Sequence, residues 1–414
     1  MSNNIKLPQY IWYNPREVEF PVPDTWQVTV NNITGYDSPA LNPDKIRDAV
    51  VLPIGMPPLR EYAKGKNAVA ILFDDLTRST RVSDIVPYVL EELSEAGIKD
   101  GQIRFIAAVA NHQALDRISM VKKLGEDVVA RFHVYNHCPF VNCTYAGTTS
   151  YGTKASINSE VMNCDLKIGI GQVVPHPQFG FSGGAKIVMP GVASYETVLD
   201  HHARIHQEWK QKQARLNPSL MGIIDDNPVN FDAREIARLA GLDMVIDCIV
   251  NMWGETVSLY AGALEPTYAS SINKAKSHYV AANTRDNDIV IANAFIKASE
   301  YHVPLSTAQP AVASGGGDIV IIASSPAGDA VHYLSKFGTI MPGLVHHHKI
   351  LSNVNRVIIY SEYPEVRILD HFVEREKVIL TSDWDRVIGL LEKSHKPDAK
   401  VAVYPSADIQ YFTG

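Results

Sequence analysis

The chain has 414 residues, enough for two or three domains of about 150 residues, each with its own core. Its net charge of −7 at pH 7 argues against a nucleic-acid partner, because such a partner requires a basic face. No apolar run approaches the ~20 residues of a membrane helix, the first residues lack a secretion signal and only four cysteines are present, so we expect a cytoplasmic protein without disulfides or a membrane partner.

Short apolar runs alternate with amphipathic stretches in the first half of the chain. Residues 68–75, 103–110 and 164–174 are typical of buried strands, and residues 85–97 of a helix closed by a glycine. The order strand, helix, strand predicts βαβ units and a largely parallel sheet.

A second series of such elements follows. The expected strands are residues 287–295, 317–324, 355–361 and 399–405, and the expected helices are residues 329–338 and 383–394. Residues 261–287 would be the crossover between two α/β lobes. We therefore expect an α/β fold with two lobes, each with a largely parallel sheet flanked by helices. The domains would be 1–265 and 266–414, with the active site in the cleft between them.

Reactive side chains follow the expected strands of the first half. Ligands of open α/β sheets bind beyond the carboxyl ends of the strands. The first such end carries Asp75, Thr77 and Arg78 within four residues. Hydroxyls and backbone N–H groups at this turn could hold a phosphate, and Arg78 a carboxylate. An ordinary helix N-cap with an internal Asp–Arg pair explains these residues equally well.

The next two strand ends carry histidines. His112 follows the run 103–110, although a lone loop histidine is more often a structural hydrogen-bonding group. His176 stands between Pro175 and Pro177, whose fixed φ angles make a stiff mount for an imidazole. All three strand ends considered thus carry a titratable or anion-binding group, which strengthens the case for each.

The segment Gly180–Gly184 matches G-x-S-x-G, the nucleophile elbow of α/β-hydrolases. An elbow needs a strand that ends at Ser182 and a helix that follows at once. Pro177 and Gly180 interrupt the approach, and Pro190 ends any helix within two turns. The pattern therefore disfavours a serine hydrolase and predicts a turn whose backbone closely approaches a flat ligand or a phosphate.

Lys186 has no acidic residue within five positions on either side, and its neighbours are apolar. A desolvated lysine loses its proton and becomes nucleophilic, which suits attachment to a carbonyl-type or thiocarbonyl-type cofactor. A solvated surface lysine fits these neighbours poorly. The three histidines 346–348 are interpreted as a solvated loop without a role.

Several of these motifs, in fixed order, resemble the lactate racemase family, the nickel-pincer nucleotide enzymes. The resemblance is specific from about residue 68 to 206 and extends to the rest of the chain at the level of the fold. It rests on Asp75-x-x-Arg78, His112, His176, GxSGGxK ending at Lys186, Pro190-Gly191 and His202. It implies a racemase or epimerase that inverts the α-carbon of a 2-hydroxy acid by reversible hydride transfer, through a 2-keto acid.

The resemblance also implies a cofactor. This is the nickel-pincer nucleotide (nickel pyridinium-3,5-bisthiocarboxylic acid mononucleotide), covalently attached to Lys186, with His202 as the protein ligand of nickel. Imidazole is a suitable nickel donor. Separate cofactor-synthesis proteins would be transient partners. The remaining cofactor-binding residues implied are Asp75, Leu76, Thr77, Arg78 and His176.

In the same way, His112 and His176 correspond to the two acid–base histidines, one for each face of the substrate. Arg78 would bind the substrate carboxylate, and His302 would also contact the small-molecule substrate. The lactate enzyme follows a Tyr-Gln pair with a lysine three residues later. Here Tyr301-His302 is followed by Leu305, and Lys297 is out of register. The second carboxylate clamp is therefore absent or differently built, which favours a substrate other than lactate, such as a sugar acid (an aldonate).

Two other functions remain open from the residues alone. One is a lyase that uses Lys186 as a Schiff base or a metal in the same pocket. The other is a non-catalytic binding protein of the same fold, although mere ligand binding does not need two bases.

Overall fold

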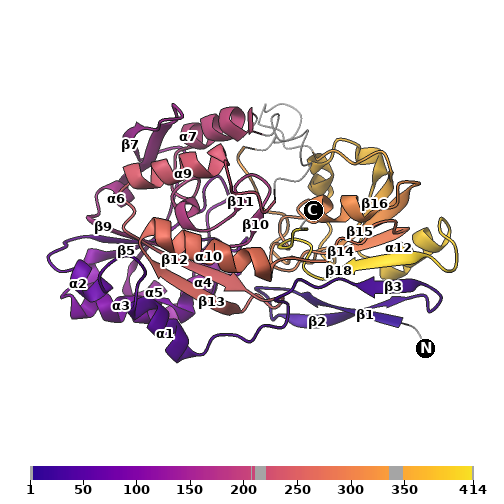
Figure 1. The fold of residues 1–414 in the computed structure, drawn as a ribbon, viewed down its shortest axis with the longest axis horizontal. Coiled ribbons are helices and arrows are strands. Elements are labelled where there is room, and N and C mark those ends of the chain that lie inside the picture. Colours follow the sequence, from indigo (N-terminus) through magenta and orange to yellow (C-terminus); the bar gives the residue numbers. More distant parts are fainter. Residues whose placement is uncertain (1–2, 207, 210–220, 335–347, 413–414) are drawn as a thin grey trace.

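The computed structural model describes residues 3–206, 208–209, 221–334 and 348–412. They form two lobes, each built on a six-stranded sheet (Figure 1). Within these residues no helix is both long and apolar enough to cross a membrane. The expected α/β fold with two lobes is confirmed.

The first sheet is parallel except at one edge, where β13 runs antiparallel to β12. Its central strands β4, β9 and β12 are buried along their whole length, which explains their uninterrupted apolar sequences. In spatial order the strands are β13 (Thr256–Gly262), β12 (Met244–Val250), β9 (Leu166–Gln172), β4 (Val69–Phe73), β5 (Ile103–Ala107) and β6 (His133–Asn136).

Helices cover both faces of this sheet. Helix α3 buries Val86, Val89 and Leu93, spaced as one face of a helix, against the same core as alternate residues of β4. On this face lie α1 (Pro43–Val51), α3 (Val86–Glu95), α4 (Arg117–Leu124) and α5 (Glu126–Arg131). On the other face lie α7 (Tyr195–Asp200), α9 (Pro228–Leu239) and the start of α10 (Leu264–His278). The helix expected over 85–97 is thus confirmed as α3.

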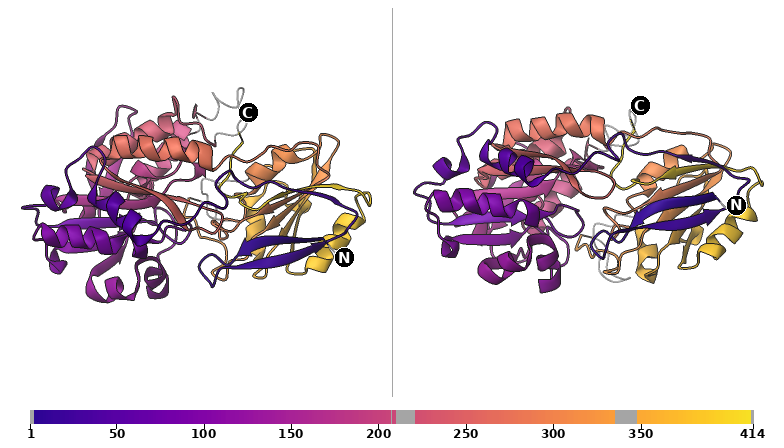
Figure 2. Two further views of the ribbon diagram at one scale, coloured as in Figure 1. Left: turned by 60° about the horizontal axis from the view of Figure 1, so that its bottom comes forward. Right: turned by 90° about the horizontal axis from the view of Figure 1, so that it is seen from below.

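The second sheet is parallel throughout. In spatial order it holds β17 (Val378–Thr381), β16 (Val354–Tyr360), β15 (Gly317–Ile322), β14 (Ile289–Asn293), β18 (Lys400–Tyr404) and β3 (Gln27–Val30). One face packs against α11 (Leu305–Ala308). The other is covered by α12 (Trp384–Glu392) and by the hairpin of β1 (Asn3–Gln9) and β2 (Arg16–Val22), drawn in indigo in Figure 2.

The chain passes between the lobes more often than a division at residue 265 implies. Residues 3–30 belong to the second lobe, because β3 pairs with β18 and the hairpin packs on the same sheet. Helix α10, which follows that division, packs against β12 and β13 of the first sheet. The domains 1–265 and 266–414 stay a prediction. An apolar cluster that joins Val173, Phe181 and Ile249 of the first lobe to Phe295 and Ile409 of the second holds the lobes together.

One predicted helix is wrong. Residues 329–334 are not helical; His332 instead forms an antiparallel bridge with His112 of the first lobe, and residues 335–338 lie outside the described residues.

The other short elements are α2 (Leu59–Tyr62), η1 (Val82–Asp84), η2 (Asp100–Gln102), β7 (Cys143–Thr148), β8 (Lys154–Asn158), α6 (Ser159–Met162), β10 (Pro175–His176), β11 (Gly180–Phe181), η3 (Gly184–Ile187), η4 (His201–His206), η5 (Gln309–Ala311), η6 (Val366–His371) and η7 (Arg375–Lys377).

Candidate active site

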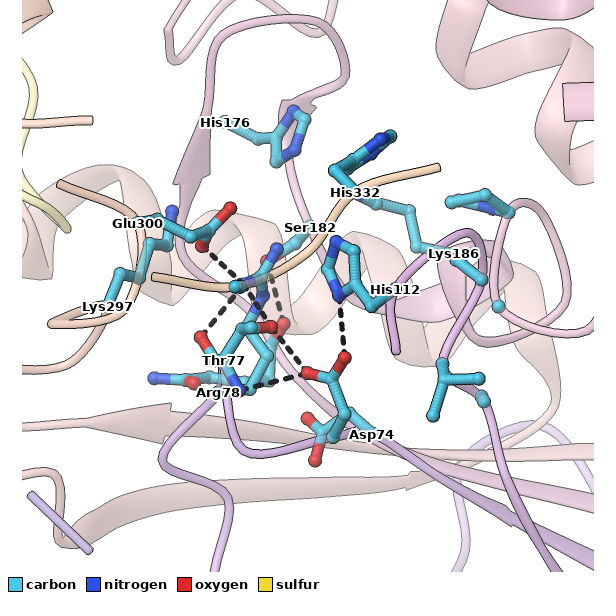
Figure 3. Close-up of a pocket in the computed structure, with 18 of the residues that line it drawn as sticks. Asp74, Thr77, Arg78, His112, His176, Ser182, Lys186, Lys297, Glu300 and His332 are labelled. Atoms are coloured by element: carbon cyan, nitrogen blue, oxygen red, sulfur yellow. Dashed lines mark hydrogen bonds and ion pairs between the residues drawn. The ribbon is translucent and has the colours of Figure 1, made fainter. Parts of the chain in front are cut away.

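A cavity of about 240 Å³ lies beyond the carboxyl ends of β4, β5 and β9, and loops of the second lobe form its opposite wall (Figure 3). It brings together almost all the candidate residues, namely Asp75, Thr77, Arg78, His112, His176, Lys186, His202 and His302. Leu76 is the exception. It lines a smaller neighbouring pocket, and its carbonyl accepts a hydrogen bond from Trp12 Nε1 (2.9 Å).

A buried ion pair shapes the turn after β4. The ammonium of Lys123, fully buried, lies 2.6 Å from Oδ1 of Asp74 and donates to the carbonyl of Arg78 (2.8 Å). Thr80 Oγ1 donates to the other carboxylate oxygen of Asp74 (2.5 Å). Because a buried charge is tolerated only when it is paired and hydrogen-bonded, these contacts fix the path of the turn and present Asp75 and Arg78 to the cavity.

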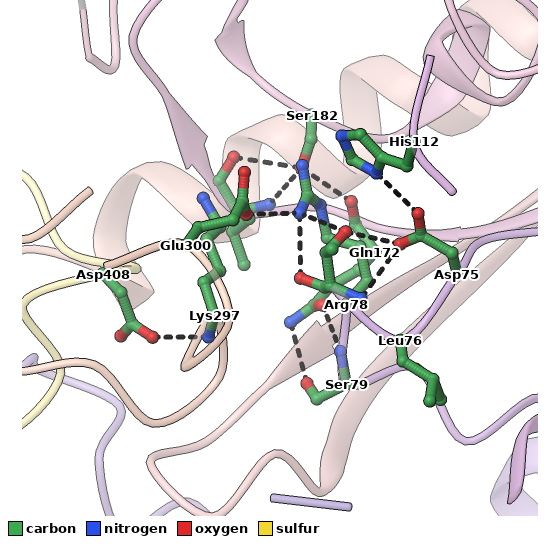
Figure 4. Close-up of polar contacts among 12 residues, drawn as sticks. Asp75, Leu76, Arg78, Ser79, His112, Gln172, Ser182, Lys297, Glu300 and Asp408 are labelled. Atoms are coloured by element: carbon green, nitrogen blue, oxygen red, sulfur yellow. Dashed lines mark hydrogen bonds and ion pairs between the residues drawn. The ribbon is translucent and has the colours of Figure 1, made fainter. Parts of the chain in front are cut away.

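Asp75 orients His112. Its Oδ2 lies 2.6 Å from Nδ1 of His112, and its Oδ1 accepts from the backbone N–H of Thr77 (2.9 Å) (Figure 4). Burial alone would raise the pKa of Asp75, but His112 and Arg78 hold that pKa well below its usual range. Burial opposes the charged form of His112 too, yet Asp75 raises the pKa of His112 above its ordinary value. The ionised Asp75 therefore accepts from Nδ1–H, and Nε2 is the atom of His112 left for proton transfer.

His176 has the opposite environment. It ends β10 in a tight hairpin with β11, and its Nδ1 accepts from the backbone N–H groups of Gln178 (3.2 Å) and Phe179 (3.4 Å). Burial, followed by the charges of Lys186 and Lys297, lowers the pKa of His176 well below its ordinary value. His176 is therefore neutral near pH 7 and carries its proton on Nε2.

Two glycines bring Lys186 to the cavity. Gly183 has φ +87°, and a Cβ at this position would lie 2.3 Å from Val173 Cγ2; the N–H of Gly184 donates to Asp247 Oδ1 (2.7 Å). The chain then enters η3 with Lys186 facing the cavity.

The Lys186 amine lies 4.3 Å from the ring centroid of Phe179, and within the described residues no carboxylate or hydrogen-bond acceptor reaches it. Burial, followed by Arg78 and Lys297, lowers the pKa of Lys186 well below its ordinary value. These conditions favour the neutral, nucleophilic form of the amine.

Ser182 is structural. Its hydroxyl donates to the carbonyl of Gln172 (2.7 Å) and accepts from the N–H of Val174 (3.0 Å), and so ties β11 to the chain that leaves β9. A 3₁₀ turn, not an α-helix, follows it. The nucleophile-elbow geometry is absent around Ser182, in agreement with the rejection of a serine hydrolase.

His202 lies at the start of η4, which continues α7. Nε2 of the neighbouring His201 lies 3.1 Å from the carbonyl of Val229 and so carries a proton. Nδ1 of a neutral His201 is then an acceptor, and it lies 3.2 Å from Nδ1 of His202. With His201 neutral, His202 donates from Nδ1 and Nε2 is its unprotonated nitrogen, the form in which histidine ligates metals.

Four histidines of the second lobe line the cavity, namely His302, His332, His348 and His371, and three of them form a cluster. The ring centroid of His302 lies 4.3 Å from that of His348 and 4.9 Å from that of His371. Nε2 of His371 lies 2.8 Å from Oδ2 of Asp329. Residues 346–348 were interpreted as a solvated loop without a role, and this interpretation did not anticipate that His348 lines the cavity; residues 346 and 347 lie outside the described residues.

Lys297 and Glu300 enter the cavity from the loop after β14 (Figures 3 and 4). Lys297 is 2% exposed, and burial, followed by the charge of Arg78, lowers its pKa to about 8. Oε2 of Glu300 lies 3.0 Å from Nη1 of Arg78. A lysine was expected three residues after the Tyr301-His302 pair, so Lys297 was left out and Glu300 was not considered. The strand-end rule, extended to residues 287–295, would have found both.

Comparison with known proteins shows what this chain is similar to. The family model described as the lactate racemase N-terminal domain matches residues 13–214. A lactate racemase from Thermoanaerobacterium thermosaccharolyticum is 27% identical over 333 residues, 78% of this chain and 75% of the relative. One from Lactiplantibacillus plantarum is 27% identical over 241 residues, 58% of this chain and 55% of the relative.

A solved structure shares the fold. The lactate racemase apoprotein from Thermoanaerobacterium thermosaccharolyticum aligns with a TM-score of 0.74 at 21% identity, over 100% of both chains. By its N-terminal domain this chain is similar to lactate racemases, which are isomerases, and it shares its fold with one of them.

Proposed function

We propose that the protein is a racemase or epimerase that inverts the α-carbon of a 2-hydroxy acid other than lactate, such as a sugar acid. The observation that carries this proposal is the pair His112 and His176, which face one cavity with opposite electrostatic environments. A binding protein has no need of two such bases, whereas inversion requires a proton-transfer group on each face of the substrate.

The site residues fit the nickel-pincer nucleotide. Lys186 offers a buried amine of lowered pKa for covalent attachment, and His202 offers its Nε2 lone pair to nickel. Among the described residues no group of three or more His, Cys, Asp or Glu side chains is placed to hold a metal, so most donors would have to come from the cofactor. When bound, this group would accept the α-hydrogen as hydride and return it, which is the step that side chains alone do not supply.

The chain's own residues bind the substrate and move its hydroxyl proton. Arg78 and Lys297 supply two cations for the carboxylate. Nε2 of His112 accepts the hydroxyl proton on one face, because Asp75 holds Nδ1–H. A planar 2-keto acid presents either face to the cavity, and the histidine on the chosen face returns a proton to the oxygen.

The Lys186 amine also suits a Schiff base, so a lysine-dependent lyase is the alternative enzyme. Intact-protein mass separates the two. A pincer adduct brings nickel, sulfur and a fixed mass on Lys186, whereas a Schiff base appears only with a carbonyl substrate and is trapped by borohydride.

The test is turnover of a panel of 2-hydroxy acids by protein co-produced with the cofactor-synthesis proteins, followed by chiral separation of the products. We expect inversion at the α-carbon, and none by protein produced without them. His112→Ala and His176→Ala should abolish turnover but retain the mass adduct. Loaded wild-type protein that inverts no acid of the panel would contradict the proposal.

A further inference from the structure

Glu300 places a carboxylate where the substrate's own carboxylate is expected. Oε2 of Glu300 lies 3.0 Å from Nη1 of Arg78, and the two side chains are 18% and 14% exposed. In the described part of the chain, every hydrogen bond of the Arg78 side chain comes from Nη1, to the Thr77 carbonyl, Thr77 Oγ1 and Glu300. The Nε and Nη2 edge remains for a second carboxylate, which a guanidinium binds through two parallel hydrogen bonds.

An ionised Glu300 restricts what can bind beside it. Burial alone would raise the pKa of Glu300, but Arg78 and Lys297 outweigh burial and lower that pKa. An ionised carboxylate accepts hydrogen bonds and cannot donate them. The part of the substrate next to Glu300 must therefore be a donor, and in a hydroxy acid the donor is a hydroxyl.

The α-hydroxyl is not that donor, because it must face His112 or His176 for proton transfer. The substrate carboxylate is held by Arg78 and Lys297. A hydroxyl on the carbon next to the α-carbon is the nearest group left to meet Glu300.

The charges lining the cavity limit the substrate to one carboxylate. Among the described residues, Arg78, Lys186 and Lys297 are the lysines and arginines of the lining, and Lys186 is taken by the cofactor in the proposed function. Glu300 offsets one of the two cations that remain. At the far wall Asp329 holds His371, so a second substrate carboxylate would meet a like charge there.

We infer that Glu300 is a specificity-determining residue, which accepts a hydrogen bond from the C3 hydroxyl and so selects 2,3-dihydroxy monocarboxylates over 2-hydroxy acids without this hydroxyl and over dicarboxylates. The inference rests on the proposed function and deepens it. It also accounts for the departure from the lactate enzyme, because lactate has no C3 hydroxyl.

The experiment compares 2,3-dihydroxybutanoate with 2-hydroxybutanoate, which differ by one hydroxyl, on cofactor-loaded protein. In Glu300→Ala the ratio of their kcat/KM values should fall by about tenfold to a hundredfold, the usual effect of a hydrogen bond to a charged group. Because both acids share the carboxylate and the α-hydroxyl, any disturbance of Arg78 cancels in this ratio. A ratio that stays within a factor of two of the wild-type value overturns the inference.

Two further measurements complete the test. Glu300→Gln should increase kcat/KM for 2-hydroxysuccinate relative to 2-hydroxybutanoate, because a like charge is removed; no increase overturns the charge argument. The matched control is Glu235→Gln, since Glu235 bonds Ser150 outside the cavity, and it should leave both ratios unchanged. Loaded wild-type protein that inverts no hydroxy acid refutes the proposed function itself, whereas inversion with an unchanged ratio refutes only the role of Glu300.

Discussion

Nδ1 of His112 lies 2.6 Å from Oδ2 of Asp75, so the carboxylate at the end of β4 fixes the imidazole that follows β5. These strands are neighbours in the first sheet, and their parallel pairing brings two residues 37 positions apart into contact. The adjacent strand β9 leads to His176 and Lys186. One edge of one sheet therefore supplies both histidines and the lysine of the proposed function.

Asp75→Asn should lower kcat of the loaded enzyme by about 10²- to 10⁴-fold, as loss of an orienting carboxylate does in Ser-His-Asp enzymes. Asp75 raises the pKa of His112 by favouring its charged form, so the substitution should lower that pKa and move the corresponding limb of the pH profile of kcat/KM to lower pH. The control is Asp37→Asn, because Asp37 is exposed. An unmoved limb would mean that Asp75 does not set the pKa of His112.

The sequence indicated which strand-end residues of the first lobe line the cavity, because these residues follow strands that can be recognised locally. Continuous apolar runs mark β4, β5 and β9, and the turn after each run carries the reactive group. Those turns meet because parallel strands end at one edge. No knowledge of long-range contacts was needed to find His112 and His176 at strand ends, whereas Lys186 was indicated by its apolar neighbours and by the family resemblance.

The second wall was harder to predict because it depends on contacts between the lobes. Residues 329–334 have a helical pattern, but His332 pairs with His112 across the cavity, and this tertiary contact overrides local propensity. The pairing of β3 with β18 joins opposite ends of the chain and leaves no local pattern. Lys297 was not selected because its position was compared with that of Tyr301, although it closely follows the end of β14.

Lys186→Arg should abolish the covalent cofactor. Arginine retains a cation but its guanidinium is not a nucleophile, so no thioamide can form. The measurement is the intact mass of protein co-produced with the cofactor-synthesis proteins. The matched control, Lys297→Met, removes the other lysine that lines the cavity within the described residues and should keep the adduct. An adduct that persists in the arginine variant would place the attachment elsewhere.

His201→Phe should weaken nickel binding by about 10- to 100-fold without loss of the adduct mass on Lys186, because His201 fixes the tautomer of His202. Nickel per protein, measured after dialysis against a chelator, tests this expectation. The control is His137→Phe, which removes another buried histidine bound to a backbone carbonyl, that of Ala193 (2.9 Å). Equal nickel loss in both variants would indicate a packing effect only.

Ser182→Ala should lower the free energy of unfolding by about 1–2 kcal/mol, because the carbonyl of Gln172 and the N–H of Val174 each lose a buried hydrogen bond. Urea unfolding followed by circular dichroism measures this change. A fluorophosphonate reagent should leave the wild-type protein unlabelled, since a carbonyl accepts the hydroxyl proton and no histidine among the described residues is hydrogen-bonded to the hydroxyl. Labelling that disappears in the alanine variant would restore the nucleophile elbow as the correct interpretation of Gly180–Gly184.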